Sequence, residues 1–395
     1  MNQLESVLLR AGQNRLAQKY PKPAVVIAVP VFNEAERIDR CVAALTAQCD
    51  RSGCLLPDGF VRVVLLTNNC TDGSYELIVE GMQHWQVALS VLDVSLPKSR
   101  RNAGCARRLA NHAALDLVPQ GSGLLFMTDA DSSVPSQWVA TYTSFLRSGY
   151  DAVAGSVDLH PEDCADIPLS LHQRGQLEGR YSELLDRLDA FIDPLPHDPW
   201  PRHYNASGAN IAVRVSALRG IDDFPDVACG EDRLFIRWLE AHGRRVRHDS
   251  ETRVYTSGRL IGRATGGMAD TLRKRVKVPN TPCDPRLEAV DRAHFRAVLR
   301  ASIRRSWADP AKRHALLQSW ADLVGVDVAL VSNTLDAKTF EAAWQNLEGA
   351  VPLLERHPLS PSELPREIRR AEHMMNSLFE STADVSEKVA DQLRT

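Results

Sequence analysis

The chain has 395 residues, of which 44% are hydrophobic and 25% are charged, a composition typical of a folded globular protein. At ~100–200 residues per domain this length allows more than one domain and excludes a single small binding module. The 47 basic and 50 acidic residues nearly cancel, so the overall charge gives no reason to expect nucleic acid as a partner.

The first residues, MNQLESVLLRAGQNRLAQKY, have no continuous apolar segment behind a basic start, as a secretory leader would. Nowhere do ~18 uncharged apolar residues follow one another, so no transmembrane segment is expected. The eight cysteines are scattered without a C-x-x-C pair, which argues against structural zinc and fits reduced thiols. We therefore expect a cytoplasmic protein.

Short apolar runs alternate with amphipathic segments from residue 24 onward. The predicted strands are AVVIAVP, VRVVLL, VALSVLDV, GLLFMT and DAVAGSVDL, and helical patterns cover residues 34–48, 72–83, 101–117 and the segment after Pro135. Continuous Val, Ile and Leu runs separated by helices indicate a mostly parallel α/β sheet covered on both faces. Ligands bind at the carboxyl ends of such strands, so the loops after Pro30, Leu66, Val94 and Thr128 should line one site.

The second half of the chain changes character twice. Residues 166–191 have a helical pattern, and the following IDPLPHDPWPRH is too rich in proline for regular structure. After residue 285 the sequence has helical periods with few strand candidates. We expect a principal domain at 1–285, with halves at about 24–160 and 161–285, and a helical extension at 286–395.

A pair of carboxylates follows the fourth apolar run. Asp129 and Asp131 stand directly after GLLFM, at the tip of a buried strand, where they would repel each other. A hard cation such as Mg²⁺ or Mn²⁺, shared with substrate phosphates, relieves that repulsion. The alternative is an ordinary turn in which Asp131 or Ser132 caps the next helix.

Three further polar segments stand at strand or helix ends. They are VPVFNE after the first run, TNNCTDGS after the second, and Cys229-Gly230-Glu231-Asp232-Arg233 before a helical pattern. Each has a structural alternative, because Thr71, Asp72, Glu231 or Asp232 can simply favour a helix start.

Together and in this order, these segments resemble the family 2 glycosyltransferases of the GT-A fold. The family's opening strand and P-x-[FY]-N-E turn correspond to AVVIAVPVFNE, its D-D-x-S-x-D-x-[ST] element to TNNCTDGS, its N-x-G…A-R element to Asn102…Arg107, and its D-x-D to Asp129-Ala-Asp131. SGANIA at 207–212 and the Glu231-Asp232 pair match its acceptor side. The resemblance covers about residues 24–275 and implies a Rossmann-like nucleotide-binding half.

The resemblance also implies roles for individual residues. It places the nucleotide sugar against Pro30, Phe32, Glu34, Asn68, Arg107 and Asp129. Asp129 and Asp131 would hold Mn²⁺ or Mg²⁺, Asp232 would be the catalytic base, and Glu231 would position the acceptor. Asn68 stands where relatives have the Asp that pairs with uracil, and because an amide also donates, another base becomes possible.

A second departure lies in TRVYTSGR, where many relatives have a metal-binding His and this chain has Thr256-Ser257. The metal would then rely on Asp131, water and phosphate oxygens. The glycine-rich segment that follows contains Arg259 and Arg263, which are expected to close over a diphosphate. A solvated basic loop is the alternative.

These implications define one expected reaction. A sugar, of the hexosyl type, moves from a nucleoside diphosphate, with UDP expected first, to an acceptor hydroxyl, with inversion inferred from the family. The alternative is a noncatalytic nucleotide-sugar-binding or scaffold protein on a degenerate GT-A fold, which Asn68 and the missing His suggest. A nucleotidyltransferase would carry a Gly-rich basic loop after its first strand, where this chain has VPVFNEAER.

Overall fold

The computed structural model describes residues 7–119, 121–221, 223–260, 262 and 266–392. The chain divides into two compact units, and each is built from two separate stretches. The first unit takes the residues up to 167 and 203–273, and the second takes 168–202 and the residues from 274 onward.

The first unit is built on an eight-stranded sheet in the order β1-β4-β3-β2-β5-β7-β6-β8. Its strands are β1 (Val7–Gln13), β2 (Val25–Val31), β3 (Val61–Asn68), β4 (Ala88–Ser95), β5 (Leu124–Met127), β6 (Ala152–Leu159), β7 (Ile211–Arg214) and β8 (Val246–Thr256). β2 runs parallel to β3 and β5, and β7 lies antiparallel between β5 and β6. β4 and β8 run in the same direction as these parallel strands, so six strands end at one edge of the sheet, while the antiparallel strands β1 and β7 begin there.

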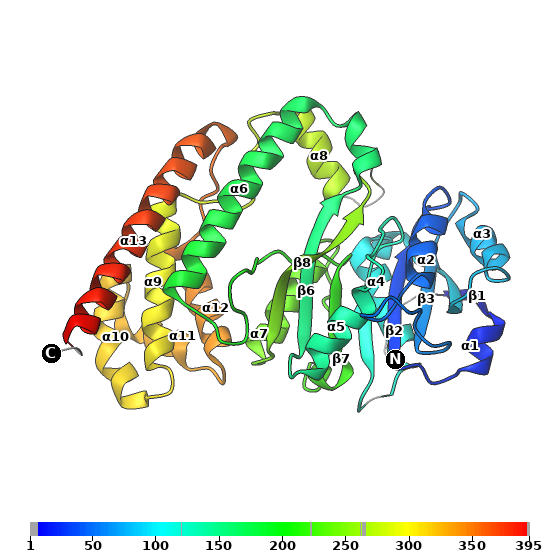
Figure 1. Ribbon diagram of the computed structural model, residues 1–395, viewed down its shortest axis with the longest axis horizontal. Coiled ribbons are helices and arrows are strands. Elements are labelled where there is room, and N and C mark those ends of the chain that lie inside the picture. Colours follow the sequence, from blue (N-terminus) through cyan, green and yellow to red (C-terminus); the bar gives the residue numbers. More distant parts are fainter. Residues whose placement is uncertain (1–6, 120, 222, 261, 263–265, 393–395) are drawn as a thin grey trace. The chain divides into compact units, whose positions relative to one another are not determined.

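Successive side chains of the central strands point to opposite faces of the sheet, so an apolar cluster lies between the sheet and the helices on each face. Val25, Ile27 and Val29 of β2 belong to the apolar cluster under α2 (Ile38–Thr46), α3 (Ser74–Gly81) and α5 (Trp138–Arg147). Val26 and Ala28 face the other cluster, under α4 (Ala103–Leu115) and α7 (Glu231–Ala241). Figure 1 shows α2 and α4 beside the central strands. Both faces of β2 are thus buried, as a continuous apolar run predicts.

The α/β class and all five strands predicted from apolar runs are confirmed. Of the other three strands, β8 overlaps the TRVYTSGR segment, and β1 and β7 were not predicted. Every residue of β1 except Gly12 is exposed, because it is an edge strand paired only with β4. The other missed strand, β7, has only four residues and lies within the SGANIA segment and its continuation.

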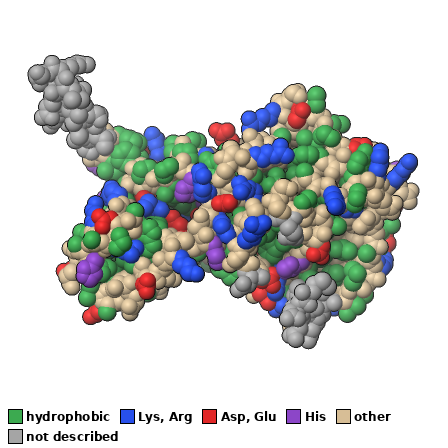
Figure 2. Space-filling view, turned by 90° about the horizontal axis from the view of Figure 1, so that it is seen from below, with side chains coloured by type: hydrophobic (Ala, Val, Ile, Leu, Met, Phe, Trp, Pro, Cys, Tyr) green, Lys and Arg blue, Asp and Glu red, His purple; other side chains and the backbone are tan. Residues whose placement is uncertain are grey.

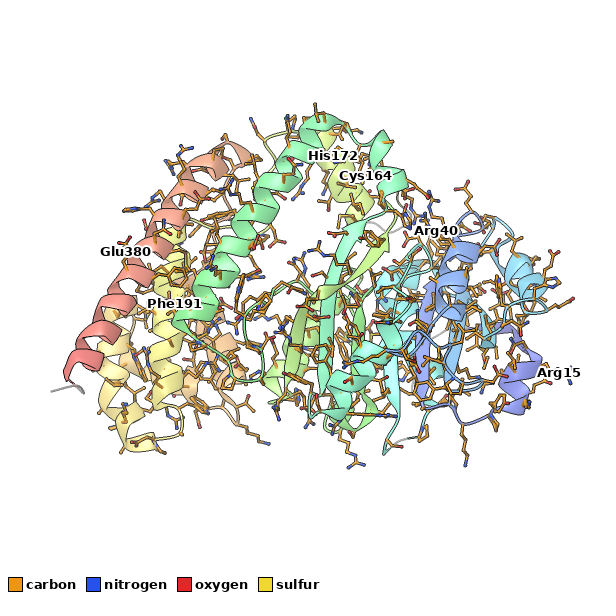
Figure 3. All side chains as sticks on the ribbon, in the orientation of Figure 1. Arg15, Arg40, Cys164, His172, Phe191 and Glu380 are labelled. Carbon is orange, nitrogen blue, oxygen red and sulfur yellow. The ribbon has the colours of Figure 1, made fainter. Side chains whose placement is uncertain are left out.

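Helices alone make up the second unit. They are α6 (Leu169–Ile192), α9 (Val290–Ser306), α10 (Pro310–Val324), α11 (Val328–Leu335), α12 (Phe340–Ala350) and α13 (Leu364–Gln392), while α8 (Met268–Lys277) leads into this part of the chain. Tyr181, Leu185 and Leu188 of α6 share an apolar cluster with residues of α9 and α13. In Figure 3, Phe191 and Glu380 mark α6 and α13, and the Phe191 ring meets Phe379 edge to face at 5.1 Å.

This packing explains why the observed division differs from the predicted boundary at residue 285. The predicted acceptor half, 161–285, included α6 as part of the principal domain. Because the apolar face of α6 packs on α9 and α13, residues 168–202 belong to the helical unit instead.

Ion pairs join α9 to two other helices of this unit, since Arg300 pairs with Asp189 of α6 at 2.6 Å and Arg296 pairs with Glu348 of α12 at 2.9 Å. Arginines recur every fourth residue on α9, and Arg296 binds both oxygens of the fully buried Glu288, at 2.9 and 3.1 Å. Glu367 of α13 accepts hydrogen bonds from the Val290 amide at 3.0 Å and from Arg370 at 2.8 Å. These pairs fix the helices at particular points along their length, which apolar contacts alone do less strictly.

Charges of both signs are distributed over the surface. Figure 2 shows Lys and Arg beside Asp and Glu on the face in view, in keeping with the balanced totals of 47 and 50. Among the helices that the structure describes, none is both long enough and apolar enough to span a bilayer.

Candidate active site

Polar side chains gather where the strand order reverses, between β2 and β5. The loops after β2, β3, β5 and β8 come to this edge, and the segment before the antiparallel strand β7 joins them. Such a reversal leaves a crevice outside the carboxyl ends of the strands, which is where open α/β sheets bind ligands.

A buried arginine joins the two acidic pairs. Arg107 of α4 donates from Nη2 to Asp129 at 2.6 Å, from Nε to Glu231 at 3.0 Å, and from Nη1 to the carbonyl of Gly208 at 3.0 Å. All three guanidinium nitrogens therefore have a partner. The structure brings the D-x-D and Glu231-Asp232 elements together through this one side chain, although they are far apart in sequence.

A second arginine, Arg259, pairs with Asp131, the other carboxylate of the D-x-D element. Arg259, in the loop after β8, binds Glu34 with two hydrogen bonds of 2.8 and 2.6 Å, and its Nη2 lies 3.2 Å from Oδ2 of Asp131. The Thr256 hydroxyl donates to Oδ1 of Asp131 at 3.1 Å. Thr256, which stands near the position of the family's metal-binding His, thus contacts the same carboxylate.

Five carboxylates, those of Glu34, Asp129, Asp131, Glu231 and Asp232, are gathered in this site. Arg107 pairs with Asp129 and Glu231, Arg259 pairs with Glu34 and Asp131, and Asp232 accepts from the Gly208 amide. Burial, together with the negative charges of Asp129 and Glu34, raises the pKa of Asp131 to about 6. A cation bound at Asp131 would offset the negative charges that raise this pKa.

Arg107 responds to the same charges in the opposite sense. Burial alone would lower the pKa of Arg107, but the charges of Asp129 and Glu231 outweigh it and raise that pKa above its ordinary value. Arg107 remains a cation at every physiological pH.

Asp232 lies in the first turn of α7, which follows Gly230 in a left-handed conformation (φ 79°). Its Oδ2 accepts from the Gly208 amide at 2.9 Å, and its Oδ1 accepts from the Arg233 amide at 2.7 Å. The Gly208 residue thus holds Arg107 by its carbonyl and Asp232 by its amide. No side chain caps this helix, because Gly230 precedes it, but Glu231 and Asp232 both lie in its first turn, where the helix dipole favours acids as the structural alternative predicted.

The turns after β2 and β3 are tied to each other. Asn33 (φ 57°) accepts from the Thr71 amide at 2.8 Å, and Asp72 accepts from the Ala35 amide at 2.9 Å. The Ser74 hydroxyl accepts from the Glu34 amide at 2.8 Å. These bonds fix the backbone of Glu34 independently of what its side chain binds.

Asn68 is buried at the end of β3, and its amide nitrogen donates to the carbonyl of Val31 at 3.0 Å. One donor of this amide is therefore committed to the neighbouring strand. An aspartate could not make this bond, which gives the departure from the family pattern a structural role beside the predicted one.

The other predicted residues are distributed as follows. Pro30 lies within β2 and Phe32 directly follows that strand, and both are half-buried. Arg263 lies outside the residues that the structure describes. The predicted diphosphate contact of Arg107 remains a prediction, since its guanidinium is engaged by three protein groups. Sequence reasoning missed the two roles of Gly208, for which only the SGANIA match gave a signal.

The donor set suits a hard cation. In the described part of the chain, no three His, Cys, Asp or Glu side chains are grouped as a ready-made metal site. Asp129 and Asp131 offer carboxylate oxygens in a negatively charged setting, which is the chemistry that Mg²⁺ and Mn²⁺ prefer. A cation held by so few protein ligands would keep waters or take oxygens from a bound phosphate, so these residues fit a metal that arrives with its substrate.

An open α/β sheet with Asp129 and Asp131 at its switch point and a second acidic pair beside them has the architecture that the resemblance to the GT-A fold implies. Residues 26–218 match the family model described as glycosyl transferase family 2. Over this segment, a little under half of its length, the chain is similar to the family 2 glycosyltransferases.

Several known proteins are similar to this chain. Glycosyltransferase AglE of Haloferax volcanii is 28% identical over 206 residues, which are 52% of this chain and 57% of that protein. The match thus spans little more than half of the relative's length.

Similar solved structures include S. aureus TarS 1-349 in complex with UDP-GlcNAc, at 15% identity and a TM-score of 0.45, covering 91% of this chain and 92% of that one. Another is the mannosyltransferase PcManGT from Pyrobaculum calidifontis in complex with GDP-Man and Mn²⁺, at 18% identity and a TM-score of 0.42, covering 82% and 86%.

Proposed function

We propose that this glycosyltransferase moves a hexosyl group from a nucleoside diphosphate to an acceptor hydroxyl, with inversion and with Mg²⁺ or Mn²⁺. The observation that carries the proposal is the acidic site itself, in which Arg107 joins Asp129 on the donor side to Glu231 on the acceptor side. A site that binds both substrates side by side meets the first requirement of group transfer, which is proximity.

The chain's own groups have distinct parts in this reaction. Asp129 and Asp131 would hold the cation, whose chemistry is to neutralise charge on the departing diphosphate. Asp232 would take the proton of the acceptor hydroxyl. The Gly208 and Arg233 amides donate to its two carboxylate oxygens and so orient them.

The base of the donor is proposed from the family and from two relatives. UDP is the first expectation, and the cited complexes hold UDP-GlcNAc and GDP-Man. Because the Asn68 amide both donates and accepts, uracil and guanine donors should be compared directly.

The variant Asp232→Asn tests the proposal. We expect release of nucleoside diphosphate from UDP-GlcNAc or GDP-Man, with water as the acceptor, to fall by ~10²–10⁴-fold, the usual contribution of general-base catalysis. Donor affinity, measured by calorimetry with Mn²⁺, should be kept. Asp158→Asn, which changes an acid on β6 paired with Arg253, is the control and should leave both unchanged. If Asp232→Asn releases nucleoside diphosphate at the wild-type rate, Asp232 is not the catalytic base.

A further inference from the structure

Arg259 is held by carboxylates that the proposed donor and its cation would also use. Its guanidinium makes two hydrogen bonds to Glu34 and an ion pair with Asp131. The three side chains are 17%, 8% and 16% exposed, so this contact is largely shielded from water. Shielding strengthens such a pair relative to one on an open surface.

This position makes Arg259 a competitor for a metal ion. Both oxygens of Asp131 have a partner, since Oδ1 accepts from Thr256 and Oδ2 faces Arg259. A cation placed on Oδ2 would lie next to the guanidinium, and two positive charges at that distance repel each other. Cation binding at Asp131 and the Arg259 contact therefore oppose each other.

The backbone of Arg259 is anchored, while its side chain is long enough to change partners. The Gly258 amide donates to Asp163 at 2.9 Å, and the Arg259 amide donates to the Ser257 hydroxyl at 3.3 Å. Glu34 is likewise fixed through its own amide by Ser74. A rotation of the side chain alone can therefore move the guanidinium, without a shift of the loop base.

We infer that Arg259 is the resident cation of the donor-free site and exchanges partners when the donor binds. It leaves Asp131 to the incoming cation and Glu34 to the nucleotide, and it binds the diphosphate, whose oxygens match a guanidinium bidentately. This inference rests on the proposed function. It assigns Glu34 a role as the docking carboxylate of Arg259, beyond a contact to the nucleotide.

The exchange predicts opposite effects of one substitution on two affinities. Arg259→Met keeps the aliphatic part of the side chain and removes its charge. Without nucleotide, Mn²⁺ alone should bind this variant several-fold more tightly than the wild type, because its competitor is gone. With saturating Mn²⁺, UDP or GDP, whichever the wild type prefers, should bind ~10–100-fold more weakly, since hydrogen bonds between charged groups are lost. Calorimetry and Mn²⁺ paramagnetic resonance measure both.

The controls separate this inference from simpler explanations. Arg253→Met removes an exposed arginine of β8 that pairs with Asp158 and should change neither affinity. Arg259→Lys keeps one charge without the bidentate geometry and should give intermediate values for both, which also guards against misfolding of the Met variant.

Suppose that the wild type binds nucleotide in a metal-dependent way and that Arg259→Met is folded. Unchanged or weaker Mn²⁺ binding by this variant would then overturn the exchange and leave the proposed function standing. A wild-type protein that binds neither UDP nor GDP, with or without Mn²⁺, would overturn the proposed function and the exchange with it.

Discussion

Gly208 is the residue whose enlargement should disturb the site most. A Cβ atom at this position would overlap the guanidinium of Arg107. Because Gly208 also binds that guanidinium by its carbonyl, the two cannot separate without breaking the hydrogen bond. We therefore expect Gly208→Ala to expel Arg107 from between Asp129 and Glu231.

The size of the effect follows from the contacts that are lost. Removing one partner of a buried ion pair lowers the free energy of unfolding by about 3–5 kcal/mol. The Asp129 side chain is 33% exposed, so water can solvate it in part, whereas Glu231 is only 10% exposed. We expect the lower end of the range, about 3 kcal/mol of unfolding free energy for the first unit.

Hydrogen exchange of peptides from β5 and β7 measures this unit without interference from the helical one. Gly121→Ala, in the same unit and with open space around the added Cβ, is the matched control and should change stability by less than about 0.5 kcal/mol. In an Arg107→Met background, Gly208→Ala should cost little further stability, because the guanidinium that the new Cβ atom overlaps is absent. Full stability and donor affinity of the single variant Gly208→Ala would refute the arrangement around Arg107.

Three further substitutions test separate features. Asn68→Asp removes the bond to the Val31 carbonyl and should raise the ratio of UDP to GDP affinity, measured by calorimetry; an unchanged ratio excludes base recognition by this residue. Glu288→Gln removes the fully buried negative charge that Arg296 binds with two hydrogen bonds, although Arg296 keeps its ion pair with Glu348. The helical unit should lose about 3 kcal/mol in urea denaturation, against less than about 0.5 kcal/mol for the exposed control Glu355→Gln, and a loss no larger than the control's would mean that the network contributes little. Burial alone would raise the pKa of Glu367, but the hydrogen bonds that its carboxylate accepts outweigh burial and lower this pKa in the folded protein. The ionised carboxylate therefore stabilises the fold above about pH 4.3, the pKa in the unfolded chain, and this stabilisation is lost as the pH falls through the lower pKa of the folded protein. The stability difference between wild type and Glu367→Gln should therefore shrink from pH 7 to pH 3, and a constant difference would contradict this.

The sheet was largely predictable, because burial on both faces imposes continuous apolar runs on its central strands. The sequences of β2 and β3 contain such apolar runs. β1 did not, since an edge strand with exposed side chains needs no such pattern.

The site was predictable in its residues but less so in its contacts. Local spacing identified Asp129 and Asp131, whereas the partners of Arg107 lie 22, 101 and 124 positions away. The bond from Thr256 to Asp131 spans 125 positions. No local pattern records which of several arginines meets which carboxylate, because that depends on how the antiparallel strand β7 and the loop after β8 reach the edge.

The interrupted order of the two units has a consequence during synthesis on the ribosome. Tyr181, Leu185 and Leu188 of α6 share their apolar cluster with residues of α9, α13 and the segments next to them. Translation must add roughly 100 residues before α9 appears, which at about 5–20 residues per second takes on the order of 5–20 s. During that interval the apolar face of α6 is uncovered on the nascent chain, a natural target for a chaperone. A shortened protein that stops at residue 285 would keep that face uncovered permanently, so expression of the sheet unit alone should also omit residues 168–202 and bridge the gap with a short linker.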